Sequence, residues 1–139
     1  MKNKGTYEVY VDGSFFNDCV SYAAVILKDG ELQKTIKGVV KEEDFISSRQ
    51  VGGELMAVMK ALEWCKENKI TSITLYYDYI GIKAWVTGEW KAKKPLTRFY
   101  ADYVKKSGIK IYWKKVKSHS GNYWNDYVDK LAKKSALEV

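Results

Sequence analysis

Hydrophobic and polar residues alternate at the start of the chain in the pattern of a half-buried β-strand. Residues 7–12, YEVYVD, place apolar side chains at every second position, and a period of two puts them on one face of a sheet. The apolar run at 22–27, YAAVIL, predicts a second, buried strand. Asp29-Gly30 then predicts a hairpin turn, so that residues 31–40 form a third strand.

Helical periodicity begins in the middle of the chain. Leu55, Val58, Met59 and Leu62 recur at helical spacing, which predicts a helix over about 48–67. The remaining predicted elements are a strand over 72–78, helices over about 79–87 and 96–107, a strand over 109–116 and a helix over about 125–136. The predicted order is therefore βββαβα(α)βα.

Length and composition favour one globular domain. A chain of 139 residues has room for one ordinary core, and 46% of the residues are hydrophobic, so residues 1–139 are expected to form a single domain. Apolar runs fall far short of the roughly 20 residues that span a bilayer, and no apolar signal core is present. We therefore expect a cytoplasmic protein, and no sequence feature implies a protein partner, an oligomer or a disulfide between Cys19 and Cys65.

The charge of the chain adds one hint about a partner. Lys and Arg total 24 against 17 Asp and Glu, which gives a formal net charge of +7 and a pI near 9.2. This balance favours a polyanionic partner such as nucleic acid. A solvated lysine surface explains the same charge without any partner.

Four carboxylates lie at element boundaries or on helix faces that can approach the sheet. Asp12 ends the alternating part of the first strand and is followed by Gly13, while Asp78 ends the strand at 72–78. Glu54 and Asp129 share their predicted helix faces with alanines, which allow close packing. Clustered carboxylates repel one another, and Mg²⁺ prefers oxygen ligands, so such a cluster would suit a metal site. Alternatively, these are four ordinary surface acids, because spacing alone cannot establish a cluster in space.

Several short segments, taken in chain order, resemble the four signature segments of ribonuclease H type 1. They are YVDGS at 10–14, GELMA at 53–57 with ALE at 61–63, LYYD at 75–78, and VKSHSG at 116–121 leading to DKLA at 129–132. They extend over almost the whole chain, and the loop and helix of the last segment are fairly specific. The resemblance implies a ribonuclease H-like α/β fold, a five-stranded mixed sheet with helices on both faces. It also implies an endonuclease that cuts the RNA strand of RNA–DNA hybrids with two Mg²⁺ ions, for which Mn²⁺ is a possible substitute.

The resemblance also assigns roles to individual side chains. Asp12 would contact both metals, Asp129 would bind the ion that activates water, and Glu54 with Asp78 would bind the ion beside the leaving group. The products would carry a 5′-phosphate and a 3′-hydroxyl. His119, the only histidine, would lie on a loop and assist proton movement or product release, since its ordinary pKa is close to neutrality. A plain solvent-exposed loop residue is the alternative for His119.

Substrate contacts follow from the same resemblance. Gly13, Ser14 and Gln50 would meet the RNA strand, and Ser48 and Arg49 would help to seat a DNA phosphate. Recognition is expected to rest on shape and 2′-hydroxyl groups rather than on base sequence.

The chain departs from the family pattern at two places. Val51 stands where the family often has an amide, and a valine side chain cannot donate a hydrogen bond. The stretch 85–96 is compact and lacks the longer basic helix that some members carry, and we expect no N-terminal hybrid-binding domain. Trp85 and Trp90 would pack either in the core or against deoxyribose. Asp126 would either support a metal-bound water or serve as a helix N-terminal acid.

Two rival functions remain at this point. One is a DNA nuclease of the same broad fold, such as a junction resolvase, and the other is a catalytically idle module that binds hybrids. Retention of four mutually repelling carboxylates argues against the idle module. If the site exists, the four carboxyl groups should share one pocket.

Overall fold

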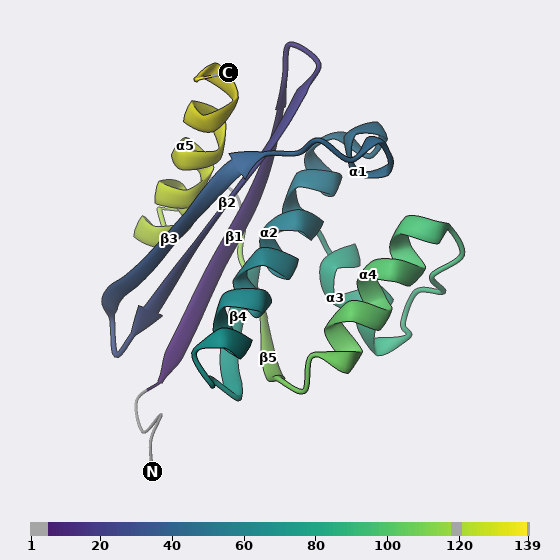
Figure 1. Ribbon diagram of the computed structural model, residues 1–139. Coiled ribbons are helices and arrows are strands. Elements are labelled where there is room, and N and C mark those ends of the chain that lie inside the picture. Colours follow the sequence, from purple (N-terminus) through teal and green to yellow (C-terminus); the bar gives the residue numbers. More distant parts are fainter. Residues whose placement is uncertain (1–5, 118–120, 139) are drawn as a thin grey trace.

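The computed structural model describes residues 6–117 and 121–138 (Figure 1). The strands are β1 (Tyr7–Phe16), β2 (Cys19–Lys28), β3 (Glu31–Val39), β4 (Ser72–Tyr77) and β5 (Lys110–Lys115). The helices are α1 (Glu43–Ser47), α2 (Arg49–Glu67), α3 (Gly81–Thr87), α4 (Pro95–Lys106) and α5 (Tyr123–Leu137). None of the helices in this part of the chain is long and apolar enough to cross a membrane.

The five strands form one mixed sheet in the order β3-β2-β1-β4-β5. β1, β2 and β3 are joined by two tight hairpins and pair antiparallel, whereas β4 and β5 continue the sheet in parallel with β1. Asp29 and Gly30 have φ angles of 52° and 84°, as the predicted hairpin turn requires. Parallel pairing needs crossover connections, and the helices supply them.

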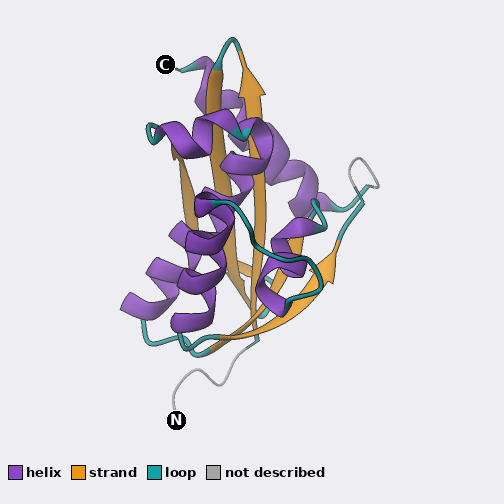
Figure 2. Cartoon of the chain, turned by 90° about the vertical axis from the view of Figure 1, so that its right-hand side faces the viewer, coloured by secondary structure: helices purple, strands orange, loops and turns teal. Residues whose placement is uncertain are grey.

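The helices cover the two faces of the sheet. α2 packs on β1 and β2 from one side, and α5 packs on β1, β2 and β3 from the other. A view turned by 90° shows the helices stacked along the sheet, with the connecting loops at the ends of the strands (Figure 2). The alternation of β1 explains this arrangement, because Val9 and Val11 enter the core under α2 while Tyr10 enters the smaller core under α5.

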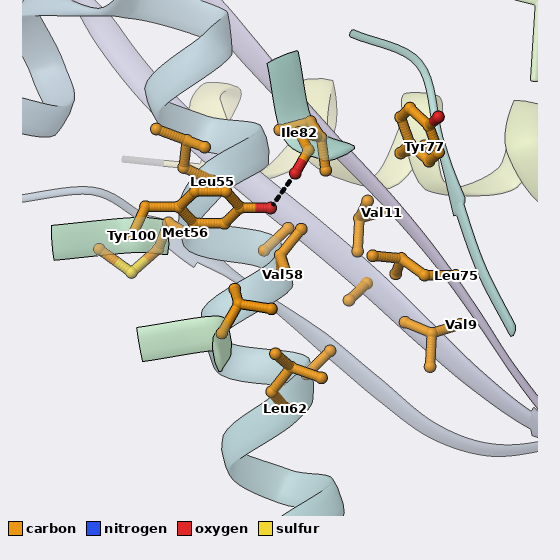
Figure 3. Close-up of a cluster of buried hydrophobic side chains, with 14 of the residues drawn as sticks. Val9, Val11, Leu55, Met56, Val58, Leu62, Leu75, Tyr77, Ile82 and Tyr100 are labelled. Atoms are coloured by element: carbon orange, nitrogen blue, oxygen red, sulfur yellow. Dashed lines mark hydrogen bonds between the residues drawn. The ribbon is translucent and has the colours of Figure 1, made fainter. Parts of the chain in front are cut away.

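The larger core contains one fully buried tyrosine whose hydroxyl group is satisfied. Tyr100 of α4 donates a hydrogen bond of 2.7 Å to the carbonyl oxygen of Ile82 on α3 (Figure 3). A buried hydroxyl group without a partner would cost stability. The bond therefore fixes α3 against α4 beside the large apolar side chains of α2, among them Leu55 and Leu62.

The observed elements match the predicted ones with two differences. β1 runs on to Phe16, so Asp12 lies inside the strand rather than at its end. The prediction also missed α1, a helix of five residues of which only Phe45 is buried. Such a short helix has too little apolar periodicity to be recognised.

Candidate active site

Close contact between β1 and α2 brings the first two carboxylates together. A β-carbon added at Gly13 of β1 would collide with the backbone of α2 at Gln50 and Glu54, and one added at Gly53 would collide with the carbonyl oxygen of Ser21 on β2. Glycine is needed at both positions because only a missing side chain permits this approach. As a result Glu54 lies against the sheet and is only 4% exposed, next to the strand residue Asp12.

Glu54 is held by the chain that follows β4. Its Oε2 accepts a hydrogen bond of 2.8 Å from the backbone N–H of Asp78, and its Oε1 accepts one of 3.4 Å from that of Tyr79. Burial nevertheless raises the pKa of Glu54 to about 8, although these N–H groups and the charge of Lys115 act in the opposite direction. The negative charge of Asp78 adds to the increase, which places that carboxylate nearby.

Strand register explains the position of Asp78. Glu8 pairs with Thr74 and Tyr10 with Tyr76 in the parallel β1–β4 ladder. β4 ends at Tyr77, so Asp78 is the first residue after the strand. The register therefore brings Asp78 to the end of the sheet at which Asp12 lies.

α5 supplies the fourth carboxylate from the opposite layer. Val128 and Ala132 of α5 are fully buried, and the Ser21 hydroxyl of β2 donates a hydrogen bond of 2.5 Å to the carbonyl oxygen of Ala132. This contact fixes the rotation and height of the helix, so that Asp129, one turn earlier, reaches the site. One carboxylate oxygen of Asp129 pairs with Lys133 at 3.1 Å.

Asp12 is the electrostatic centre of the group. Burial is the main cause that raises its pKa to about 8, and the charge of Glu54 and the hydrogen-bonding and charge interactions with Asp129 raise it further. The backbone N–H of Gly13 donates a hydrogen bond of 2.9 Å to Asp12, which offsets only part of the increase. The carboxyl group of Asp12 thus lies between two other carboxylates in a partly desolvated position.

The side chains of the described residues are not already arranged as a set of metal ligands. Within 6–117 and 121–138, no three acidic, cysteine or histidine side chains have the geometry of a metal site. The contacts explain this, because Glu54 is turned toward backbone N–H groups and Asp129 toward Lys133. The structure therefore links Asp12 with Glu54 and Asp129, and Glu54 with Asp78, through pairwise contacts and charge interactions.

The residues expected at the substrate lie along one flank of this group. Gly13 and Ser14 belong to β1, and Gln50, in the first turn of α2, lies directly against Gly13. Arg49 has a φ of 55° at the α1–α2 junction, and its guanidinium carbon lies 5.3 Å from the centre of the Phe15 ring. Ser48 lies at the same junction and donates a long hydrogen bond of 3.4 Å to the carbonyl oxygen of Asp44.

Two further candidates were His119 and Asp126. His119 falls outside the described residues, so its predicted role remains a prediction. Asp126 lies in the first turn of α5, where an acid stabilises the helix dipole. This position accounts for Asp126 without a part in the reaction.

Two features of the site could not be predicted from the sequence. Lys115 at the end of β5 acts on Glu54 through its charge, but nothing in its lysine-rich surroundings distinguishes it from its neighbours. Trp85 and Trp90 pack edge to face with ring centres 5.8 Å apart, and both contact Tyr79. The two tryptophans thus form one aromatic cluster directly after Asp78.

The mixed sheet in the order β3-β2-β1-β4-β5, with helices on both faces and carboxylates near the end of β1, is that of a ribonuclease H-like α/β fold. The chain belongs to the ribonuclease H family, whose sequence model matches residues 4–137. Members of this family hydrolyse the RNA strand of RNA–DNA hybrids, and the chain is an enzyme of this kind. The predicted family, fold and reaction are thereby confirmed.

Individual relatives agree with this assignment over nearly the full length. The ribonuclease H of Neorickettsia sennetsu is 32% identical to this chain and covers 94% of it, and 92% of that protein is matched. The holo form of a ribonuclease H domain from D. hafniense is 38% identical with a TM-score of 0.58, over 96% of this chain and 90% of that one. The fold is also that of ribonuclease H1 from Halobacterium salinarum, with a TM-score of 0.81 at 18% identity over 97% of this chain and 100% of that one.

Proposed function

We propose that Asp12, Glu54, Asp78 and Asp129 carry the ribonuclease H reaction of this chain by holding two divalent metal ions. Mg²⁺ is the proposed ion and Mn²⁺ a substitute. The observation that carries the proposal is the position of Asp12 between Glu54 and Asp129, where burial and neighbouring negative charge raise its pKa. A group of carboxylates in mutual conflict gains most from a bound cation.

The chemistry of the donor set fits such ions. All four side chains offer carboxylate oxygen, and neither cysteine belongs to the group: Cys65 is buried in the core under α2, and Cys19 opens β2 at the hairpin after Phe16. Oxygen-only donor sets suit hard cations such as Mg²⁺ and Mn²⁺ rather than zinc. Binding would require Asp129 to exchange its contact with Lys133 for the metal, which is a small change at a partly exposed side chain.

Each carboxylate has a distinct role in the proposal. When bound, a metal pair supplies activation of a water and stabilisation of the departing oxygen. Asp12 is the shared ligand, Asp129 serves the water side, and Glu54 and Asp78 serve the leaving-group side. The backbone N–H groups of Asp78 and Tyr79 hold the Glu54 carboxylate in place. The products carry a 5′-phosphate and a 3′-hydroxyl, and His119 assists proton movement or product release.

The hybrid is proposed to lie across the flank formed by β1 and the start of α2. Gly13, Ser14 and Gln50 face the RNA strand in this arrangement, and Ser48 and Arg49 seat a phosphate of the DNA strand. Gly13, Ser14 and Gln50 lie close together because Gly13 allows the α2 backbone to approach. Shape and 2′-hydroxyl contacts, rather than base edges, would then select the hybrid.

One cleavage assay tests the proposal. The protein is incubated with an RNA–DNA hybrid, duplex RNA and duplex DNA of the same sequence, in Mg²⁺, in Mn²⁺ and with a chelator. Cleavage of the hybrid RNA alone, dependent on added metal and ending in 5′-phosphates, is expected. Cleavage of duplex DNA or full activity with the chelator would contradict the proposed site chemistry.

A further inference from the structure

One side of the sheet is left uncovered at β4 and β5. α5 packs on β1, β2 and β3 and lies toward the β3 edge, away from β5 (Figure 1). Cross-strand partners point to the same side of a sheet, and Thr74 pairs with Tyr112 and Tyr76 with Lys114. The alternate residues, among them Leu75 and Trp113, contact the core under α2. The side of the sheet that α5 leaves open therefore carries the following residues, here called the β4–β5 face: Ser72, Thr74, Lys110, Tyr112 and Lys114. Tyr76 borders this face, because its ring packs against the core under α5.

This β4–β5 face carries an exposed aromatic ring beside positive charge. Tyr112 is 52% exposed, and the Nζ atom of Lys110 lies 5.3 Å from the centre of its ring. Lys114, two residues further along β5, is also exposed. This arrangement offers a flat ring on which a base can stack, next to positive groups that attract phosphate.

A hollow beside Tyr112 adds hydroxyl groups to this face. It has a volume of about 270 Å³ and is lined by Tyr112, Thr71, Ser72 and Thr74, with Tyr7 and Ile73 beside them. Thr6, which directly precedes β1, also lines it. Hydroxyl groups both donate and accept hydrogen bonds, which suits base edges and ribose better than an apolar partner.

The β4–β5 face is continuous with the active site. Tyr76 lies two residues before Asp78, which directly follows β4, and its ring stacks on Tyr10 with centres 4.2 Å apart. Thr74, beside Tyr112, is four residues from Asp78, which corresponds to about 13 Å along a strand. Tyr112 therefore lies within reach of a polynucleotide strand that extends a few nucleotides from the carboxylates.

We propose that the β4–β5 face binds a single-stranded polynucleotide segment that continues from the hybrid held at the active site. A base stacks on Tyr112, phosphates lie near Lys110 and Lys114, and the hydroxyl-lined hollow receives a base edge or ribose. Stacking on exposed aromatic rings beside basic groups is how sheet surfaces bind single strands. The inference rests on the proposed hybrid site for its starting point, whereas the face itself is defined by β4 and β5 alone.

A simpler explanation covers only part of these observations. Exposed lysines on an edge strand such as β5 prevent pairing with another sheet. That role explains Lys110 and Lys114, but it accounts neither for the exposed ring of Tyr112 nor for the hollow beside it. Glu8, an acid on the same side of the sheet, accepts a hydrogen bond of 2.9 Å from the Tyr76 hydroxyl. It lies on the β1 side, away from the lysines of β5.

Binding of extended and blunt hybrids distinguishes the two explanations. Fluorescence anisotropy is measured with a chelator, so that nothing is cut, on a blunt hybrid and on hybrids carrying a short 5′ or 3′ single-stranded extension of RNA or of DNA. The proteins compared are the parent, Tyr112→Ala, Tyr112→Phe and Lys110→Gln/Lys114→Gln. The charge-matched control is Lys34→Gln/Lys60→Gln, whose lysines lie on β3 and α2, and thermal melting establishes that each variant is folded.

The decisive quantity is the ratio of the affinity for an extended hybrid to the affinity for the blunt hybrid. We expect the parent to bind at least one extended hybrid about tenfold more tightly than the blunt one, the usual size of a base-stacking contribution. Tyr112→Ala and the Lys110/Lys114 pair should bring this ratio close to one, whereas Tyr112→Phe and the control pair should keep it. An equal affinity of the parent for blunt and extended hybrids would overturn the proposal, and so would an advantage that survives Tyr112→Ala. Loss of cleavage in Asp12→Asn tests the active site separately, because the binding ratio does not depend on cleavage.

Discussion

Gly53 of α2 lies so close to Gly13 of β1 that a β-carbon at Gly53 would be 3.0 Å from the Cα atom of Gly13. This contact lets the backbones of α2 and β1 touch. Glu54 follows Gly53 in α2, and Ser14 follows Gly13 in β1. The distance between the Asp12 and Glu54 carboxylates is therefore set by two missing side chains.

Replacement of Gly53 by alanine tests this relationship. In an ordinary helix interior alanine is more stable than glycine by up to about 1 kcal/mol. Here the added carbon would meet the carbonyl oxygen of Ser21, so overpacking should instead destabilise the protein by about 1–3 kcal/mol. Urea unfolding measures the change, and cleavage of the hybrid should fall as Glu54 is displaced. An unchanged or higher stability would show that the contact is looser than described.

The sequence predicted the parts of the fold that depend on local patterns. The alternation around Val9 and Val11 predicted both faces of β1, and the helical spacing of Leu55 and Leu62 predicted α2. The alternation reaches only to Asp12, but the strand does not end there. It continues to Phe16 because β1 pairs with β2 along its whole length, a tertiary effect that local pattern does not contain.

The site was accessible from the sequence only through the resemblance. Spacing alone leaves Asp12 and Asp129 as two acids separated by most of the chain, whereas the Ser21–Ala132 hydrogen bond that sets the rotation of α5 exists only in the folded protein. The charge interaction between Lys115 and Glu54 likewise exists only in the folded protein. The β4–β5 face is open because of the strands that α5 covers. The sequence of α5 does not indicate which strands these are.

Binding of the hybrid should depend strongly on salt. The net charge of +7 predicts phosphate contacts, and about four of them would weaken binding about a hundredfold between roughly 50 and 200 mM salt. Base sequence should change the affinity little, since no element reads the major groove in the proposed arrangement. Titration of several hybrid sequences with Asp12→Asn protein measures both effects. A flat salt response would contradict the electrostatic part of the prediction.

Metal-free protein should lose stability as the pH rises through the neutral range. The pKa values of Asp12 and Glu54 are raised to about 8 in the folded protein, against about 4 in an unfolded chain. Below about pH 4 both groups are protonated in both states, so they oppose folding least. Between about pH 4 and 8 the unfolded chain releases these protons first, and the free energy of unfolding falls with pH. Above about pH 8 the loss is complete.

Urea unfolding at intervals from about pH 5 to 9 measures this trend, and Glu54→Gln serves as the comparison because it cannot ionise. The difference in unfolding free energy between Glu54→Gln and the parent should grow in favour of the variant as pH rises. Asp102→Asn, an exposed position on α4, should give a difference that hardly changes with pH. A difference that is constant for Glu54→Gln as well would mean that Glu54 does not carry the raised pKa.

Replacement of Asp12 by asparagine should separate catalysis from stability. The change removes the shared metal ligand while keeping nearly the same shape, so cleavage should fall by at least about a hundredfold, since even residues that only support metal ligands cost up to that factor. In chelator the variant should be more stable than the parent by on the order of 1 kcal/mol, because the repulsion of Asp12 by Glu54 and Asp129 is gone. This gain should be clearest above about pH 8, where Asp12 of the parent is ionised.

Added Mg²⁺ should reverse that order of stability. A ligand that binds only the folded state stabilises it by mass action, so millimolar Mg²⁺ should raise the Tm of the parent and raise that of Asp12→Asn much less. The two melting curves should therefore approach each other or cross as metal is added, while Asp102→Asn should follow the parent throughout. Thermal melting with chelator and with Mg²⁺, run beside the cleavage assay, measures all three proteins. Substantial cleavage by Asp12→Asn, or an equal response of parent and variant to Mg²⁺, would show that Asp12 is not the shared ligand, because removal of that ligand must weaken both metal sites at once.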